Sequence, residues 1–173
     1  MVRGWNWRRW MAPLLLCVVW AAAMTAARAD GAEPVANRAG AGTAADAIVG
    51  NWLTEPRDGI IQISVLPDGS FQGRVIGGSN PHRLDQRNPQ PALRKLELLG
   101  RVIMRDMHYE GQERWAGGTI YDPSSGHTYR CRLELQDTGH LKIRGFLGVA
   151  LLGRSQLWTR YLGSSMLLPK SAP

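Results

Sequence analysis

Short runs of alternating apolar and polar residues dominate the chain between residues 48 and 162. In "TYRCRLELQ", residues 128–136, the apolar positions Tyr129, Cys131, Leu133 and Leu135 face one side and the polar residues face the other. This period of two is typical of a strand with one buried and one solvated face. The stretches "IIQISVL" and "HLKIRGFLG" repeat it.

Turn signals such as Pro67-Asp68-Gly69 and Thr138-Gly139 separate these runs. Eight strands are predicted, at residues 49–55, 60–66, 71–76, 101–109, 114–121, 127–136, 140–148 and 154–161. Consecutive hairpins make an antiparallel meander, and a meander of this length tends to close because closure removes exposed edges. A sandwich would need longer crossing connections. We therefore predict an all-β, antiparallel up-and-down barrel of about eight strands.

One segment, residues 78–100, interrupts the meander. Its proline-rich half cannot be a central strand, whereas "ALRKLELL", residues 92–99, is long enough for two helical turns. We expect a short helical or irregular insertion that lies across one mouth of the barrel.

The first 29 residues have the three parts of an export signal. Arg3, Arg8 and Arg9 give a basic start, residues 11–24 form an apolar run, and "ARA" precedes a cut before Asp30. The run is shorter than the roughly 20 apolar residues of a membrane span, and a retained signal anchor is the alternative. We expect a periplasmic or secreted protein with no membrane span after cleavage. Its parts are a signal peptide (1–29), a flexible leader or weak helix (30–47), the barrel domain (48–162) and a C-terminal tail (163–173).

Removal of the signal changes the charge and the cysteine count. The whole chain has 21 basic and 14 acidic residues, and cleavage leaves 17 basic against 14 acidic, a net charge of +3. No basic cluster with interleaved aromatic residues remains, so nucleic-acid binding is not expected. Cys17 leaves with the signal, and Cys131 is then a lone cysteine without a disulfide partner. Its place among apolar neighbours predicts a small core residue.

The stretch "GGTIYDPSSGHTY", residues 117–129, holds the densest group of side chains with catalytic chemistry. Ser124 or Ser125 beside His127 is only an adjacency, without the strand-to-helix elbow of hydrolases. Asp122-Pro123 starts a turn and Gly126 supplies a positive φ, so turn chemistry explains the motif. We expect no enzyme. The histidines show no metal-binding spacing, and neither a metal nor a cofactor is expected.

The series "GNWLTE", "PDGSFQGRVI", "DQRNPQPALR", "LLGRVI", "WAGGTIYDPSSGHTYRCRLEL", "LKIRGFLG" and "SQLWTRY" spans residues 49–161. In order and spacing it resembles a bacterial family of exported proteins catalogued as domain of unknown function 2147. The resemblance implies a lipocalin-like β-barrel from Gram-negative-type bacteria, with no established activity or ligand.

Trp52 early in the first strand and Arg160 late in the last strand are predicted to form a barrel-closing pair. First and last strands are neighbours in a closed barrel, so the guanidinium can stack on the indole. The alternative is a buried tryptophan and an unrelated surface arginine.

An eight-stranded barrel is either filled by its own side chains or holds one small ligand. The candidate cavity liners are Trp115, Tyr121, Tyr129, Arg144 and Trp158. Aromatic residues with one cation suit an amphipathic ligand with an anionic head, such as a fatty acid. Strict alternation with Leu141 and Ile143 instead places Arg144 on the outer face.

Asp85 and Asn88 in the insertion are two further candidate contacts, at the mouth of the barrel. The alternative is that their side chains hydrogen-bond the loop's own backbone.

The leading function is an exported carrier or sensor of a small apolar or amphipathic molecule. The second is an envelope protein-interaction or structural module with a filled barrel, and an undetected enzyme is the third. A cavity separates the first from the second, and a cleft with convergent ionisable groups would mark the third.

Overall fold

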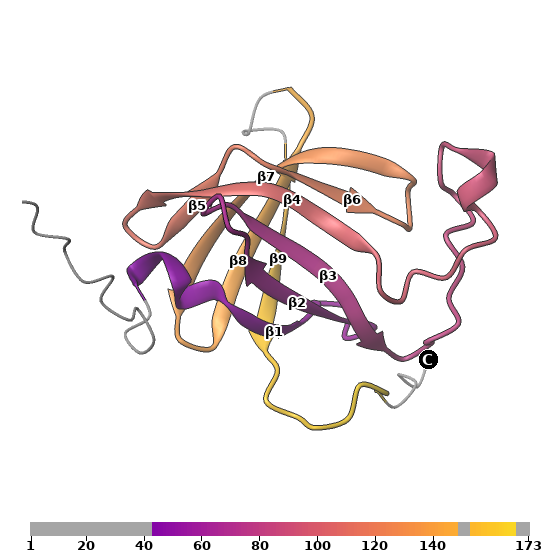
Figure 1. Cartoon of the computed structure of the whole chain (residues 1–173), viewed down its shortest axis with the longest axis horizontal. Helices are drawn as coiled ribbons and strands as arrows, with labels where there is room; N and C mark the ends of the chain where they lie inside the picture. The colour runs from indigo at the N-terminus through magenta and orange to yellow at the C-terminus, as the bar shows by residue number, and fades with distance from the viewer. Residues whose placement is uncertain (1–42, 149–152, 169–173) are drawn as a thin grey trace, which may run out of the picture. The chain divides into compact units, whose positions relative to one another are not determined.

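The computed structural model describes residues 43–148 and 153–168, and within them nine strands form one closed antiparallel sheet (Figure 1). The strands are β1 (Gly50–Leu53), β2 (Gly59–Val65), β3 (Phe71–Gly78), β4 (Val102–Gly111), β5 (Arg114–Ala116), β6 (Thr119–Asp122), β7 (His127–Asp137), β8 (His140–Phe146) and β9 (Arg154–Arg160). Each strand pairs with the next along the meander, except that β5 and β6 both lie between β4 and β7, and β9 returns to β1. The predicted all-β barrel is confirmed.

β5 and β6 are two halves of one predicted strand, because both lie between β4 and β7. The break falls at Gly117 and Gly118. A Cβ on Gly118 would lie 2.1 Å from the backbone oxygen of Arg105 on β4, so the two strands approach too closely there for a side chain. The barrel thus has eight strand positions, one of them interrupted.

The alternation predicted for residues 128–136 is present in β7. Cys131, Leu133 and Leu135 are buried, and their polar neighbours are exposed. Burial raises the pKa of the Cys131 thiol to about 12, so it stays protonated and acts as a packed core group.

The end of the expected leader is ordered. Residues Ala44–Ile48 form the 3-10 helix η1, and the Asp46 carboxylate accepts hydrogen bonds from the Thr43 N–H and hydroxyl. Ile48 is fully buried in the core, and the Ala45 carbonyl accepts from Trp115 Nε1 at 3.1 Å. This helix closes one end of the barrel, so for residues 44–47 the leader has the helical form given as the alternative and not the flexible form.

The insertion is less helical than predicted. Its 3-10 helix η2 covers only Pro91–Leu93, and the helix expected over residues 92–99 does not form. Backbone hydrogen bonds from Asp85 N to Leu96 O and from Leu98 N to Arg83 O instead form an isolated antiparallel bridge between Leu84 and Glu97. The pairing buries Leu98 and leaves Leu96 exposed, so tertiary contacts override local helix propensity.

The start of the C-terminal tail runs beside the end of β3. Gly78 N donates to Met166 O at 2.9 Å, and Leu168 N donates back to Gly78 O at 3.1 Å. The expected signal peptide, most of the leader and residues 169–173 lie outside the described residues. Among the described residues, no helix is long and apolar enough to cross a membrane.

Candidate functional site: a cavity in the open half of the barrel

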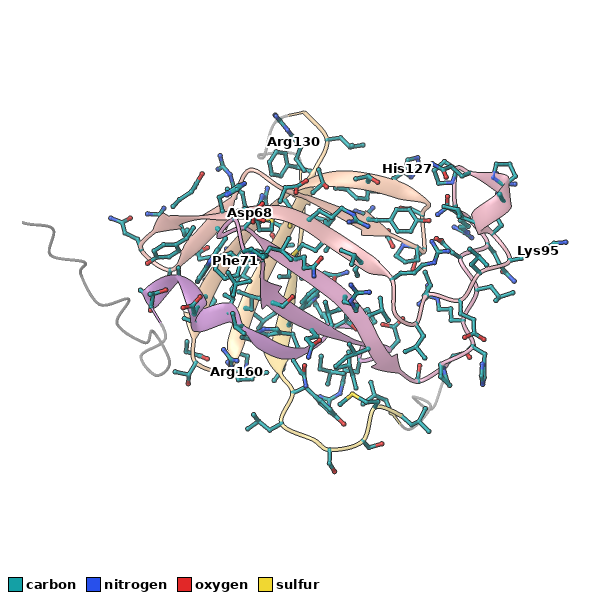
Figure 2. All side chains as sticks on the ribbon, in the orientation of Figure 1. Asp68, Phe71, Lys95, His127, Arg130 and Arg160 are labelled. Carbon is teal, nitrogen blue, oxygen red and sulfur yellow. The ribbon has the colours of Figure 1, made fainter. Side chains whose placement is uncertain are left out.

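The half of the barrel opposite η1 encloses a cavity of about 780 Å³. Its mouth is formed by the β1–β2 loop, the insertion between β3 and β4, the β6–β7 turn and the ends of β8 and β9. Figure 2 shows His127 at this end, beside the insertion, while Phe71 and Arg160 lie toward the opposite end. The barrel is therefore packed at one end and hollow at the other.

Branched aliphatic side chains form the deep wall of the cavity. Ile61, Val75, Ile103, Ile120 and Ile143 line it, from five different strands. Such a wall has no hydrogen-bonding capacity and favours an apolar occupant.

The inward row of β9 adds polar groups to this wall. The register pairs Gly145 with Arg154 and Ile143 with Gln156, so Arg154 and Gln156 face the interior. Trp158 continues the row and donates from Nε1 to Gln156 Oε1 at 3.1 Å. Along this row, the Trp158 indole lies in the interior and the Arg154 guanidinium lies at the mouth.

Gly145 leaves space beside these groups. A Cβ on Gly145 would approach the Tyr129 side chain at 3.4 Å and Ile120 at 3.8 Å. The Tyr129 hydroxyl lies 3.3 Å from Ser125 Oγ, which in turn donates to Asp122 Oδ2 at 2.8 Å. Hydroxyl groups thus line the mouth beside the apolar wall.

Tyr121 joins the cavity wall to the insertion. Its hydroxyl donates to Asp85 Oδ1 at 2.6 Å, and Asn88 Nδ2 donates to Asp85 Oδ2 at 2.6 Å. Two effects raise the pKa of Tyr121 to about 12. Burial is the larger effect, and the hydrogen bond to the Asp85 carboxylate is the second. Asp85 is 1% exposed, so this network is a buried polar lock between β6 and the insertion.

A second link to the insertion is ionic. Arg83 lies 3.0 Å from Asp58 Oδ2 on the β1–β2 loop and donates to Ser124 Oγ at 2.9 Å. Arg87 donates to the Ser124 backbone oxygen at 2.6 Å. Three loops of the mouth are therefore tied together by two arginines.

The β6–β7 turn is held by hydrogen bonds among its own residues. Asp122 Oδ1 accepts from Ser124 N at 2.8 Å, and Gly126 N donates to Asp122 O at 2.8 Å. Gly126 has φ +76°, and a Cβ there would lie 2.1 Å from Arg87 O. The Ser125 hydroxyl donates to Asp122 Oδ2, not to the His127 ring.

Two predicted liners lie elsewhere. Trp115 is fully buried in the packed end, where it stacks edge-on against Phe71 with centroids 6.4 Å apart. Arg144 lies on the outer face, donates to Ser155 Oγ at 3.0 Å and pairs across strands with Arg132, because its neighbours Ile143 and Gly145 face inward. These are corrections: neither residue lines the cavity.

Of the other candidates, Tyr121, Tyr129 and Trp158 do line the cavity. Asp85 and Asn88 lie behind Tyr121 in the buried lock, and they support the mouth rather than lining the cavity. The sequence did not identify Arg83, Arg154 or Gln156. Extending the alternation back from Trp158 would have placed Gln156 and Arg154 on the inner face.

Trp52 and Arg160 are brought together where β1 meets β9. The guanidinium carbon of Arg160 lies 4.2 Å from the centroid of the Trp52 ring, and the two residues are paired in the ladder. Arg160 also donates to the backbone oxygens of Thr138, Val49 and Ala47 at 2.7, 3.1 and 2.6 Å. Burial lowers the pKa of this guanidinium.

The described residues show no cluster of potential metal ligands. No group of three or more His, Cys, Asp or Glu side chains converges there in a way that could hold an ion.

A closed meander that is packed at one end and hollow at the other defines a lipocalin-like barrel. A solved structure, protein HP1028 from the human pathogen Helicobacter pylori, described as belonging to the lipocalin family, is similar to it. The two share 22% sequence identity with a TM-score of 0.60, over 66% of this chain and 82% of that chain.

The chain belongs to the bacterial family described as "Uncharacterized protein conserved in bacteria (DUF2147)", whose model matches residues 50–160. No curated protein matches the chain significantly. The family and the lipocalin-like fold predicted from the sequence are confirmed.

Proposed function

We propose that this protein is an exported carrier or sensor that binds one small apolar or amphipathic molecule inside its barrel. The observation that carries the proposal is the cavity of about 780 Å³, which lies within the roughly 300–1,000 Å³ typical of ligand sites. A packed interior would have favoured the structural alternative, and the open half of this barrel is not packed.

The lining supports an amphipathic occupant. Five aliphatic side chains form the deep wall, whereas Tyr129, Gln156 and Arg154 lie toward the mouth. The Arg154 side chain has no hydrogen bond or ion pair with another described residue, so its guanidinium is available to an anionic head group. A chain in the interior and an anion at Arg154 would satisfy both halves of the site.

We propose a binding role rather than catalysis because the two aspartates of the mouth, Asp58 and Asp122, are already engaged by neighbouring groups. Asp58 pairs with Arg83, and Asp122 accepts hydrogen bonds from its own turn. These contacts order loops, and they do not place a base beside a nucleophile.

The proposal is tested by filling the cavity. Ile120 faces the interior opposite Tyr129, so Ile120→Trp is expected to weaken binding of an apolar fluorescent probe at least about tenfold. The control is Leu157→Trp, on the outward face of β9 and 44% exposed, which should bind like the wild type. Equal binding by all three proteins, each with an unchanged circular dichroism spectrum, would contradict an interior site.

Export is the second part of the proposal and has its own test. The basic start, apolar run and "ARA" motif support cleavage before Asp30. Mass spectrometry of the protein recovered from the periplasm or medium should show Asp30 as the first residue. A chain that stays in the cytoplasm with its first 29 residues intact would refute export.

A further inference from the structure

A second hollow of about 490 Å³ lies beside the mouth of the cavity, between the insertion and the β6–β7 turn. Its basic lining residues are His82, Arg83 and Arg87, and it is closed on the other side by Pro123 and Ser124. We call it the arginine groove.

The arginine groove is continuous with the cavity. Asn80, Arg83, Pro123 and Ser124 line both spaces. A molecule with its apolar part in the barrel can therefore extend its polar part past Ser124 into the groove.

The groove carries positive charge without acidic residues in its own lining. Two carboxylates outside the lining pair with its basic residues, Glu97 with His82 at 2.8 Å and Asp58 with Arg83 at 3.0 Å, whereas Asp122 is engaged within its own turn. Arg87 differs from Arg83 because its guanidinium bonds a backbone carbonyl and pairs with no carboxylate among the described residues. Its remaining N–H groups can serve an incoming anion.

We propose that the arginine groove binds the phosphate group of a single-chain amphiphile whose chain occupies the cavity. Both Arg83 and Arg87 contact Ser124, so two guanidinium groups meet at one turn. A phosphate presents more oxygens and more charge than a carboxylate and matches two such forks better. This inference rests on the proposed function, since it assumes that the chain lies in the barrel.

The test compares three probes that separate the head group from the chain: dodecyl phosphate, dodecanoate and inorganic phosphate. Binding is measured by isothermal titration calorimetry on the full mature protein, below the critical micelle concentration of each amphiphile. We expect dodecyl phosphate to bind about tenfold more tightly than dodecanoate, and inorganic phosphate to bind far more weakly than either.

The variant that tests the groove is Arg87→Gln. It should remove the preference for dodecyl phosphate and leave dodecanoate binding within about twofold of the wild type. The matched control is Lys95→Gln, which removes one charge from the same insertion at a side chain that points away from the barrel (Figure 2). It should keep the preference, and thermal melts should show that both variants are folded.

The outcomes separate this inference from the function on which it rests. Equal binding of dodecanoate and dodecyl phosphate by the wild type, or a preference that persists in Arg87→Gln, would overturn the groove and leave the carrier standing. Failure of both amphiphiles to bind would overturn both proposals. Inorganic phosphate binding as tightly as dodecyl phosphate would show a phosphate site that needs no chain, which also overturns the inference.

Discussion

Arg160 makes more contacts where β1 meets β9 than an exposed surface arginine would. It covers the Trp52 ring and donates to three backbone oxygens from two separate segments. The first residue of β1, Gly50, has φ +133°, and a Cβ there would lie 2.9 Å from Arg160 Nη1. The "GNW" motif thus combines a backbone that admits the guanidinium with an indole that receives it.

Arg160→Ala is expected to destabilise the barrel by about 2–4 kcal/mol, because it removes the cation–π contact and the donors to three carbonyls. Urea unfolding followed by tryptophan fluorescence measures this. The surface control Lys142→Ala, whose ammonium lies 3.6 Å from Glu134, should cost less than about 1 kcal/mol. If Arg160→Lys were as stable as the wild type, the stabilisation would not depend on the geometry of the guanidinium.

Tyr121 gives a pH-dependent prediction. Its folded pKa of about 12 lies above the ordinary value of 10.0, so its contribution to stability is complete below pH 10 and is lost as the pH rises towards 12. Tyr121→Phe should therefore lower stability by about 1–2 kcal/mol at neutral pH, and the difference should shrink above pH 10. Guanidinium unfolding of both proteins across this range measures it, with the half-buried Tyr161→Phe as control. A constant difference would exclude ionisation of Tyr121 as the cause.

At the scale of elements, the strands were predictable and the insertion was not. Period-2 alternation and hairpin turns located all eight strand positions, because each strand has one buried face. Residues 92–99 read as helix, but the backbone bonds of Arg83 and Asp85 to Leu98 and Leu96 place Glu97 in an antiparallel bridge. Those bonds join residues that local sequence cannot relate.

The residues of the candidate site divide in the same way, into those that the local sequence pattern predicts and those that only the folded structure brings to the site. Tyr129 was placed in the cavity by the alternation of its strand and Trp158 as an aromatic residue of a long strand, whereas Arg144 was chosen for its charge against the alternation of its own strand. Arg154 holds the equivalent charge on the inner face, next to Gly145 in the ladder. Recognising Arg83 required the folded position of the insertion.

The buried lock at Asp85 should control the order of the insertion. Asp85→Asn places an amide where the carboxylate accepts from Tyr121 and Asn88, which is expected to cost about 1–3 kcal/mol locally. Hydrogen exchange should rise in peptides covering residues 79–100 and 122–126 and stay unchanged in β7 and β8. Glu97→Gln, an exposed carboxylate of the same insertion, is the control. Uniform exchange increases over the whole barrel would instead indicate global destabilisation.

At the scale of the whole molecule, the two ends of the barrel differ in how tightly they are packed. The end closed by η1 holds Trp52, Trp115 and Phe71 in a packed core, and the other end is hollow with its loops tied by hydrogen bonds. A rigid, preformed cavity lowers the entropy lost when a ligand binds. This division of packing is what the carrier proposal depends on.

Native mass spectrometry of the mature protein, purified without denaturation from the bacterium that produces it, tests the central claim most directly. The account predicts an extra mass on the folded protein that disappears on denaturation and is absent from Ile120→Trp. A bare polypeptide mass, together with no displacement of an apolar probe by lipid extracts of that bacterium, would contradict a carrier.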